Sequence, residues 1–278
     1  MLEIVLLTIA LLGTLIASYY DLKTTEIPDW LPIVMIIAGI AINFANYLLT
    51  KNPDYILLSF FNGIIFTLIG FSMYLAGQWG AGDAFLLIAV GFLIPKNFLI
   101  RSDFPFVFTY LTNLFFLGSI YMILYSLFYA VKNEKIIKEF LMQLRRFSFS
   151  ILILFILFIL ASLIFYYFLF HDLNIRVPIL VSSISTFLII IFIFSKVVEK
   201  SFIRKIPVSK LKVGDVLLEN KRWEGITKEE IERIKKSGRK YVYIKSGICF
   251  APSFFIALVF TMLFGNSVFL LINLFSLI

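Results

Sequence analysis

The sequence predicts an all-α polytopic membrane protein of about eight transmembrane helices, with a small α+β cytoplasmic domain. Hydrophobic residues make up 61% of the 278 positions and charged residues only 15%, which leaves too little polar surface for one soluble domain. Several apolar runs reach about 20 residues, the length that crosses a hydrocarbon core of about 30 Å. The runs are solid, as in residues 151–161, whereas strands of a membrane barrel alternate apolar and polar residues.

The distribution of positive charge predicts the orientation of these spans. If the loop after the first span is cytoplasmic, all but four of the 25 Lys and Arg residues fall inside: the exceptions are Lys51, Lys96, Arg101 and Arg176. Cytoplasmic loops of membrane proteins carry such an excess of positive charge. The net charge of +8 therefore requires no nucleic acid partner. We expect a multi-pass protein of the cytoplasmic membrane, in contact with membrane lipid.

The first five spans define a predicted membrane core, residues 1–131. Its apolar runs lie near residues 4–20, 30–49, 55–76, 84–100 and 104–131. The fourth is short, because Trp79 to Ile94 covers only about 24 Å as a helix against about 30 Å of hydrocarbon. We infer that the glycine-rich entrance, residues 77–82, dips into the membrane, where irregular backbone is tolerated if it lines a cavity.

The second half of the chain divides by composition. Residues 132–147 mix charges with apolar side chains at helical spacing, which predicts an amphipathic helix on the membrane surface. Residues 148–197 predict an additional membrane hairpin. Residues 198–247 are polar and predict the cytoplasmic domain, in which a capping box at Thr227 opens a helix between short strands. Residues 248–278 predict a C-terminal membrane span, either continuous or broken near Gly265.

Two aspartates stand out at the ends of membrane spans. Asp21 closes the first apolar run, and Asp83 follows Gly80-Ala81-Gly82 at the start of the fourth. If each run crosses the membrane once, both lie at the same membrane face. Carboxylates at such positions are energetically expensive and usually functional. The simpler alternatives are that Asp83 is the N-cap of a helix and that Asp21 is an acid at the membrane interface.

A pair of carboxylates is the minimal set for hydrolysing a peptide bond without metal. When two carboxylates are close, repulsion and desolvation keep one protonated and one ionised. The ionised acid takes a proton from water, while the neutral acid hydrogen-bonds the scissile carbonyl. Gly80 and Gly82 would allow substrate backbone to approach closely. With one cysteine, Cys249, and one histidine, we expect no metal site of the paired-cysteine kind and no cofactor, and we interpret Cys249 as an apolar filler.

The segment Asp21–Pro28 after the first span and the segment Gly80–Asp83 opening the fourth resemble the GxGD aspartyl proteases of the archaeal preflagellin and type 4 prepilin peptidase family. The resemblance covers about residues 1–100 and implies that Asp21 and Asp83 form a catalytic pair. It also implies that the substrates are flagellin-like or pilin-like precursors whose short basic leaders are cleaved at the cytoplasmic face. Glu26 and Asp29 would suit docking of such a leader, although a solvated acidic loop is the simpler interpretation.

The sequence departs from this family in two ways. Ala84 and Phe85 follow the motif aspartate, where family members often have a lysine. The archaeal enzymes typically have six spans, so residues 148–197 would add a hairpin to a six-helix family core. Two alternatives stay open. The first is an intramembrane protease of the presenilin-like or signal peptide peptidase-like kind, because Tyr20-Asp21 and Ala251-Pro252-Ser253 faintly resemble motifs of those proteins, although their two acids lie on neighbouring spans. The second is a non-enzymatic multispan transporter, although its expected paired broken spans are missing.

Overall fold

The computed structural model describes residues 2–99, 104–172 and 174–276, and it divides into two compact units. The first comprises Met1–Met122 with Arg204–Ile278, and the second comprises Ile123–Ile203. The long helices of the chain are α1 (Leu2–Thr24), α2 (Trp30–Thr50), α3 (Asp54–Leu75), α5 (Phe106–Val131), α6 (Glu134–Phe170) and α7 (Arg176–Ser201). Its shorter elements are α4 (Ala81–Leu93), β1 (Ile203–Pro207), η1 (Val208–Lys210), β2 (Val216–Leu217), α8 (Lys228–Lys236), β3 (Tyr241–Lys245), α9 (Ala251–Phe264) and α10 (Ser267–Ser276).

The predicted class, a helical polytopic membrane protein, is confirmed. Among the described residues, six helices are long and apolar enough to cross a membrane: α1, α2, α3, α5, α6 and α7. The fourth and last predicted spans are represented by shorter apolar helices, α4 and α9. The described residues thus contain six long apolar helices and two shorter ones at the positions of the roughly eight expected spans, and the fourth is short, as the sequence predicts.

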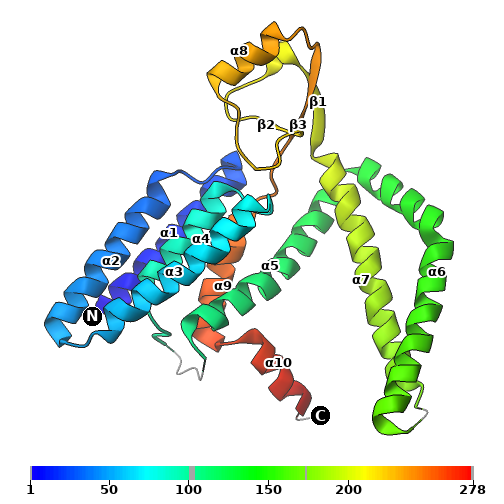
Figure 1. The fold of residues 1–278 in the computed structure, drawn as a ribbon, viewed down its shortest axis with the longest axis horizontal. Helices are drawn as coiled ribbons and strands as arrows, with labels where there is room; N and C mark the ends of the chain where they lie inside the picture. The colour runs from blue at the N-terminus through cyan, green and yellow to red at the C-terminus, as the bar shows by residue number, and fades with distance from the viewer. Residues whose placement is uncertain (1, 100–103, 173, 277–278) are drawn as a thin grey trace. The chain divides into compact units, whose positions relative to one another are not determined.

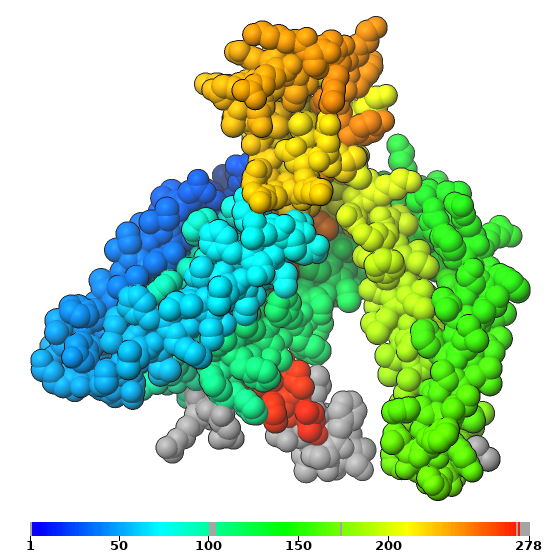
Figure 2. All heavy atoms as spheres, in the orientation of Figure 1, coloured from blue at the N-terminus to red at the C-terminus, as the bar shows by residue number. Residues whose placement is uncertain are grey.

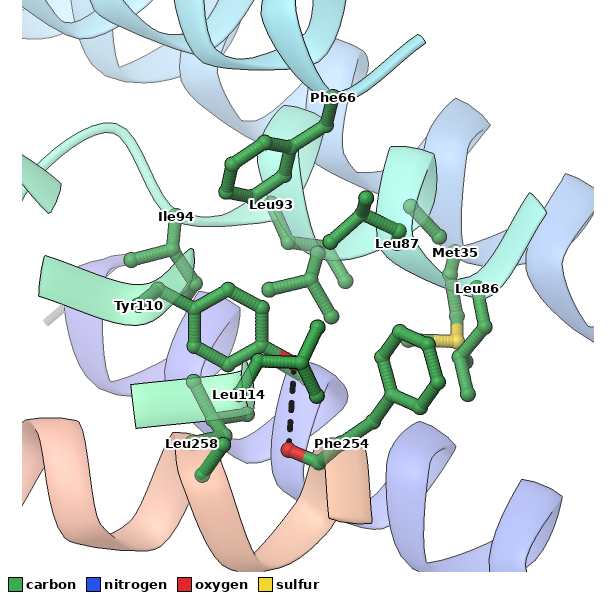
Figure 3. Close-up of a cluster of buried hydrophobic side chains, with 14 of the residues drawn as sticks. Met35, Phe66, Leu86, Leu87, Leu93, Ile94, Tyr110, Leu114, Phe254 and Leu258 are labelled. Atoms are coloured by element: carbon green, nitrogen blue, oxygen red, sulfur yellow. Dashed lines mark hydrogen bonds between the residues drawn. The ribbon is translucent and has the colours of Figure 1, made fainter. Parts of the chain in front are cut away.

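The short helix α4 is the centre of the first unit. It packs against α1, α2 and α3 (Figure 1). Leu86, Leu87, Ala89, Val90 and Leu93 are completely buried. A helix that is apolar around its whole circumference is stable only when protein or lipid surrounds it on all sides, and here side chains of α3, α5 and α9 complete the enclosure (Figure 3).

The buried C-terminal end of α4 is held by polar side chains of its neighbours. The last carbonyl groups of a helix have no partner within the helix, and in a membrane they must find one in the protein. Asn43 of α2 donates to the Phe92 carbonyl at 3.0 Å, and Ser59 of α3 donates to the same oxygen at 2.6 Å. Asn62 of α3 donates to the carbonyls of Ile94 and Pro95 at 2.8 and 3.0 Å. These bonds allow a 13-residue helix to end inside the bundle.

The last apolar run is interrupted, which decides between the two possibilities left open by the sequence. Helix α9 ends at Phe264, and Gly265 adopts a positive φ of 73°. Asn113 of α5 holds the break, because its side chain donates to the Gly265 carbonyl at 2.7 Å and accepts from the Ser267 N–H at 2.9 Å. Of the two possibilities for residues 248–278, the structure has the broken one, with helices α9 and α10 on either side of Gly265 and Asn266.

Residues 204–246 form a small polar subdomain with its own core. Its sheet has the order β1-β3-β2, with β2 antiparallel to β3 in the register Val216 to Lys245. The predicted capping box is present, because Thr227 accepts from the Glu230 N–H and Glu230 accepts from the Thr227 N–H. Six buried apolar residues form the core: Val208, Leu211, Leu217, Ile226, Ile231 and Val242. The small α+β part is therefore confirmed.

The second unit contains α6 and α7, which pack along each other. Residues 132–147 were expected to form a separate surface helix, but α6 is one continuous helix from Glu134 to Phe170 and changes direction along its length (Figure 1). The expected boundary at residue 148 thus lies inside a helix, because no glycine or proline interrupts it there. Ser162 and Ser182 form a polar contact between the two helices, 3.5 Å apart.

Candidate active site

Asp21 lies on the last turns of α1 and is bound to the start of α9. Its carboxylate accepts a hydrogen bond from the backbone N–H of Ala251 at 2.8 Å, and only 7% of its surface is exposed. Ala251 is the first residue of α9, where backbone N–H groups are free and favour an anionic partner. The neighbouring Cys249 thiol donates to the Asp21 carbonyl at 3.2 Å. Asp21 is therefore a buried acid with defined hydrogen-bond partners.

Asp83 lies in the first turn of α4, two residues after the helix starts. Gly80 occupies the N-cap position, and its N–H donates to the Asp83 carboxylate at 3.2 Å. The alternative in which Asp83 itself is the N-cap is therefore wrong, because Asp83 is the third helical residue. One Asp83 oxygen bonds the start of its own helix, and its side chain is only partly buried.

The loop that leads to Asp83 is tightly built. Helix α3 ends in a glycine motif in which Gly77, with a positive φ of 69°, donates to the Tyr74 carbonyl and Gln78 donates to the Met73 carbonyl. The next residue, Trp79, turns inward and is 8% exposed. Its ring lies 5.6 Å from Phe254 of α9 and 6.2 Å from Phe115 of α5, measured between ring centroids. Trp79 thus anchors the loop to the membrane core.

The segments that carry the two acids meet in the first unit, where α1 packs against α4. The loop after Asp21 also touches the start of α4, because a Cβ added to Gly82 would lie 3.0 Å from the Ile27 Cβ. In this structure Ile27 fills the space beside Gly82, which the sequence interpretation had reserved for substrate backbone. The glycine permits close contact between the two acid-bearing segments.

The residue after Asp83 packs against α3 before the end of that helix. A Cβ at Gly70 would lie 3.1 Å from the Ala84 carbonyl oxygen, so the residue after Asp83 packs against Gly70. Gly70 precedes the end of α3 at Leu75 by about one and a half turns, or about 8 Å along the axis. The depth of the glycine-rich entrance in the membrane stays a prediction.

The two acids expected to dock a leader peptide are both exposed. Glu26 lies on the loop after Asp21, and its carboxylate faces the Gly214 backbone of the polar subdomain. Asp29 is the N-cap residue of α2, but its side chain makes no capping hydrogen bond. Both side chains are therefore exposed in the segment that follows Asp21, and their role in docking stays a prediction.

The sequence interpretation missed the contribution of Cys249 and Ala251. Cys249 was interpreted as an apolar filler, whereas its thiol bonds the Asp21 backbone. Pro252 signals that a helix starts nearby, but nothing local indicates that this start meets Asp21. Among the described residues, no group of three or more His, Cys, Asp or Glu side chains is arranged to hold a metal ion.

The fold and the acid pair define a helical membrane protein with a two-carboxylate site, and comparison with known proteins identifies its relatives. Residues 7–130 match the type IV leader peptidase family, which confirms the resemblance over that segment. The chain is similar to the preflagellin peptidase of Methanocaldococcus jannaschii, with 37% identity over 101 residues, covering 36% of this chain and 43% of the relative.

Two further relatives match longer segments. The preflagellin peptidase of Methanococcus voltae is 32% identical over 149 residues, or 49% of this chain and 64% of the relative. The prepilin peptidase EppA of Methanothermobacter thermautotrophicus is 27% identical over 165 residues, or 54% of this chain and 43% of the relative. The matched region is thus less than two thirds of the length of each of these relatives.

Proposed function

We propose that this protein is a membrane aspartyl endopeptidase that removes the leader peptides of preflagellin-like or type IV prepilin-like precursors at the cytoplasmic face. The observation that carries the proposal is the packing of α1 against α4 and the contact of Ile27 with Gly82, which bring the segments that carry Asp21 and Asp83 together within one unit. The similarity to preflagellin and prepilin peptidases supports the substrate class.

The chemistry follows from two acids that share a site. One carboxylate takes a proton from a water molecule, which attacks the scissile carbonyl, while the other donates a hydrogen bond to the carbonyl oxygen. The roles exchange when the tetrahedral intermediate collapses and the leaving amine is protonated. Because the two groups titrate as a pair, the proton belongs to the pair rather than to one residue.

A cleavage assay tests this proposal. The purified protein, reconstituted in lipid vesicles, is mixed with a preflagellin and a prepilin precursor, and the products are analysed by mass spectrometry. We expect release of an intact leader. We also expect a precursor whose leader lysines and arginines are replaced by glutamine to be cut more slowly, since Glu26 and Asp29 are exposed in the segment that follows Asp21. Absence of cleavage of both precursors would overturn the proposal.

The intramembrane protease alternative has one observation in its favour. The Ala251-Pro252-Ser253 segment starts α9, and the N–H of Ala251 bonds Asp21, so this motif lies beside the acid pair. The same mass spectra discriminate the two activities, because a cut within the apolar helix of the precursor, rather than at the end of its leader, would favour that alternative.

A further inference from the structure

The polar subdomain, residues 204–246, contacts the loop between α3 and α4, which leads to Asp83. The indole N–H of Trp223 donates to the Gly77 carbonyl at 3.0 Å. A Cβ added to Gly77 would collide with the Lys221 carbonyl oxygen. The backbone of the subdomain therefore lies directly against this glycine. Figure 2 shows the yellow atoms of the subdomain against the cyan atoms at this end of α3.

Side chains of the same segment contact the last turn of α3. The Tyr74 hydroxyl donates to the Glu224 carboxylate, and the Arg222 guanidinium lies 5.8 Å from the centroid of the Tyr74 ring. Arg222 and Glu224 also form an ion pair with each other, 3.6 Å apart. Three consecutive residues, Arg222 to Glu224, therefore hold the end of α3 and the first residues of the loop.

Trp223 is itself braced within the subdomain. The Lys245 ammonium lies 4.5 Å from the centroid of the Trp223 ring, and the same ammonium donates to the Asn220 carbonyl at 2.7 Å. A side chain fixed on its ring face and at its N–H group has little rotational freedom left. Its hydrogen bond therefore restrains the position of the Gly77 carbonyl.

The subdomain also reaches the loop that follows Asp21. A Cβ at Gly214 would lie 3.3 Å from a Glu26 carboxylate oxygen. Gly214 belongs to the same face as the 221–224 segment, because Gly225 packs against Gly214 and the Gly214 N–H donates to the Ile226 carbonyl at 3.1 Å. One surface of the subdomain thus touches both acid-bearing loops.

We propose that the polar subdomain sets the position of the Asp83 loop and that Trp223 is the positioning residue. The loop from Gly77 to Gly80 has an inner anchor, Trp79, and an outer anchor, the Trp223 bond to Gly77. Only two residues separate Gly80 from Asp83, so a shift of the loop moves the Asp83 carboxylate relative to Asp21. This inference rests on the proposed endopeptidase function and assigns to the subdomain a role in aligning its acid pair.

The test removes the Trp223 hydrogen bond and leaves the aromatic ring. Trp223→Phe is compared with wild type in the cleavage assay, in reconstituted vesicles. Misplacement of a reacting group by a fraction of an ångström is costly, so we expect kcat to fall on the order of tenfold while KM stays within about twofold. If the Trp223 contact only stabilises the fold, its loss would lower the amount of active protein but leave kcat per active site unchanged. Active-site titration measures the amount of active protein and so separates these two cases.

Variants at two further positions, Tyr74 and Glu224, keep the test independent of folding. Tyr74→Phe removes the hydroxyl group of α3 that donates to Glu224, and we expect kcat to fall as in Trp223→Phe. Glu224→Gln retains an acceptor oxygen and should keep most of the activity, whereas Glu224→Leu should not. The matched control is Glu219→Gln, which breaks the ion pair between Glu219 and Arg239 elsewhere in the subdomain and should leave kcat unchanged.

A second measurement does not depend on cleavage. Hydrogen exchange of the peptide covering residues 77–83 reports the opening of the loop, whose amides at Gly77, Gln78 and Gly80 are all hydrogen-bonded. We expect faster exchange in Trp223→Phe than in wild type or Glu219→Gln. Unchanged exchange together with an unchanged kcat would overturn the positioning role. If wild type cleaves nothing, the proposed function fails, while the exchange data still decide whether the subdomain holds the loop.

Discussion

The carboxylate of Asp21 accepts a hydrogen bond from the backbone N–H of Ala251, 2.8 Å away, although 230 positions separate the two residues in the chain. The contact joins the end of α1 to the start of α9, and α1 and α9 pack along each other. One of the two candidate catalytic acids is therefore held by the C-terminal part of the chain, outside the segment 7–130 that matches the leader peptidase family.

Neutral replacements of either acid should abolish cleavage. Asp21→Asn and Asp83→Asn each remove an ionisable oxygen from the pair, so neither the general base nor the general acid role can be completed. We expect a loss of at least about a thousandfold in kcat, with normal insertion measured by protease protection. Asp54→Asn, an exposed aspartate at the start of α3, is the control. Substantial cleavage by either Asn variant would exclude a two-aspartate mechanism.

Removal of the Asp21 acceptor should cost stability as well as activity. In Asp21→Asn the amide oxygen can still accept from Ala251, whereas Asp21→Ala leaves the buried N–H without a partner. An unsatisfied buried donor costs about 1–3 kcal/mol, so the Ala variant should unfold at a lower detergent concentration than the Asn variant. Equal stability of these two inactive variants would show that the Ala251 contact contributes nothing to folding.

Asn62 should be essential for the short helix α4. Its amide satisfies the carbonyls of Ile94 and Pro95, and Asn62→Leu would leave both without this donor inside the bundle. We expect a loss of about 1–3 kcal/mol in the free energy of unfolding for each unsatisfied group. Thr67→Val on the same helix is a matched control, because the Thr67 hydroxyl bonds only its own helix at Gly63. A stable Asn62→Leu variant would contradict this account of the α4 terminus.

Gly82 should be required for packing against Ile27 rather than for access of substrate backbone. Gly82→Ala places a Cβ 3.0 Å from the Ile27 Cβ, which forces the two acid-bearing loops apart, and we expect kcat to fall roughly tenfold. Adding Ile27→Ala makes room and should restore part of the lost activity, as measured in a double-mutant cycle. If the double variant is as inactive as Gly82→Ala, the glycine serves another purpose, such as close approach of the substrate.

Several features of the fold could be predicted because they depend on local sequence. The long apolar runs predict α1, α2, α3 and α5, and the capping box at Thr227 predicts the start of α8. Two elements could not be predicted in this way. The continuity of α6 past residue 147 was missed because a change in composition from charged to apolar does not by itself end a helix. The C-terminal end of α4 depends on Asn43, Ser59 and Asn62, which lie on other helices.

The sequence by itself determined that this is a helical membrane protein and that Asp21 and Asp83 lie at span ends, because hydropathy and charge act through the composition of contiguous segments. Only the tertiary structure decided what holds the two acids: the N–H of Ala251, the close contact between Gly82 and Ile27, and the bond from Trp223 to Gly77. Each of these contacts joins residues far apart in the chain, and its geometry arises only when the helices pack.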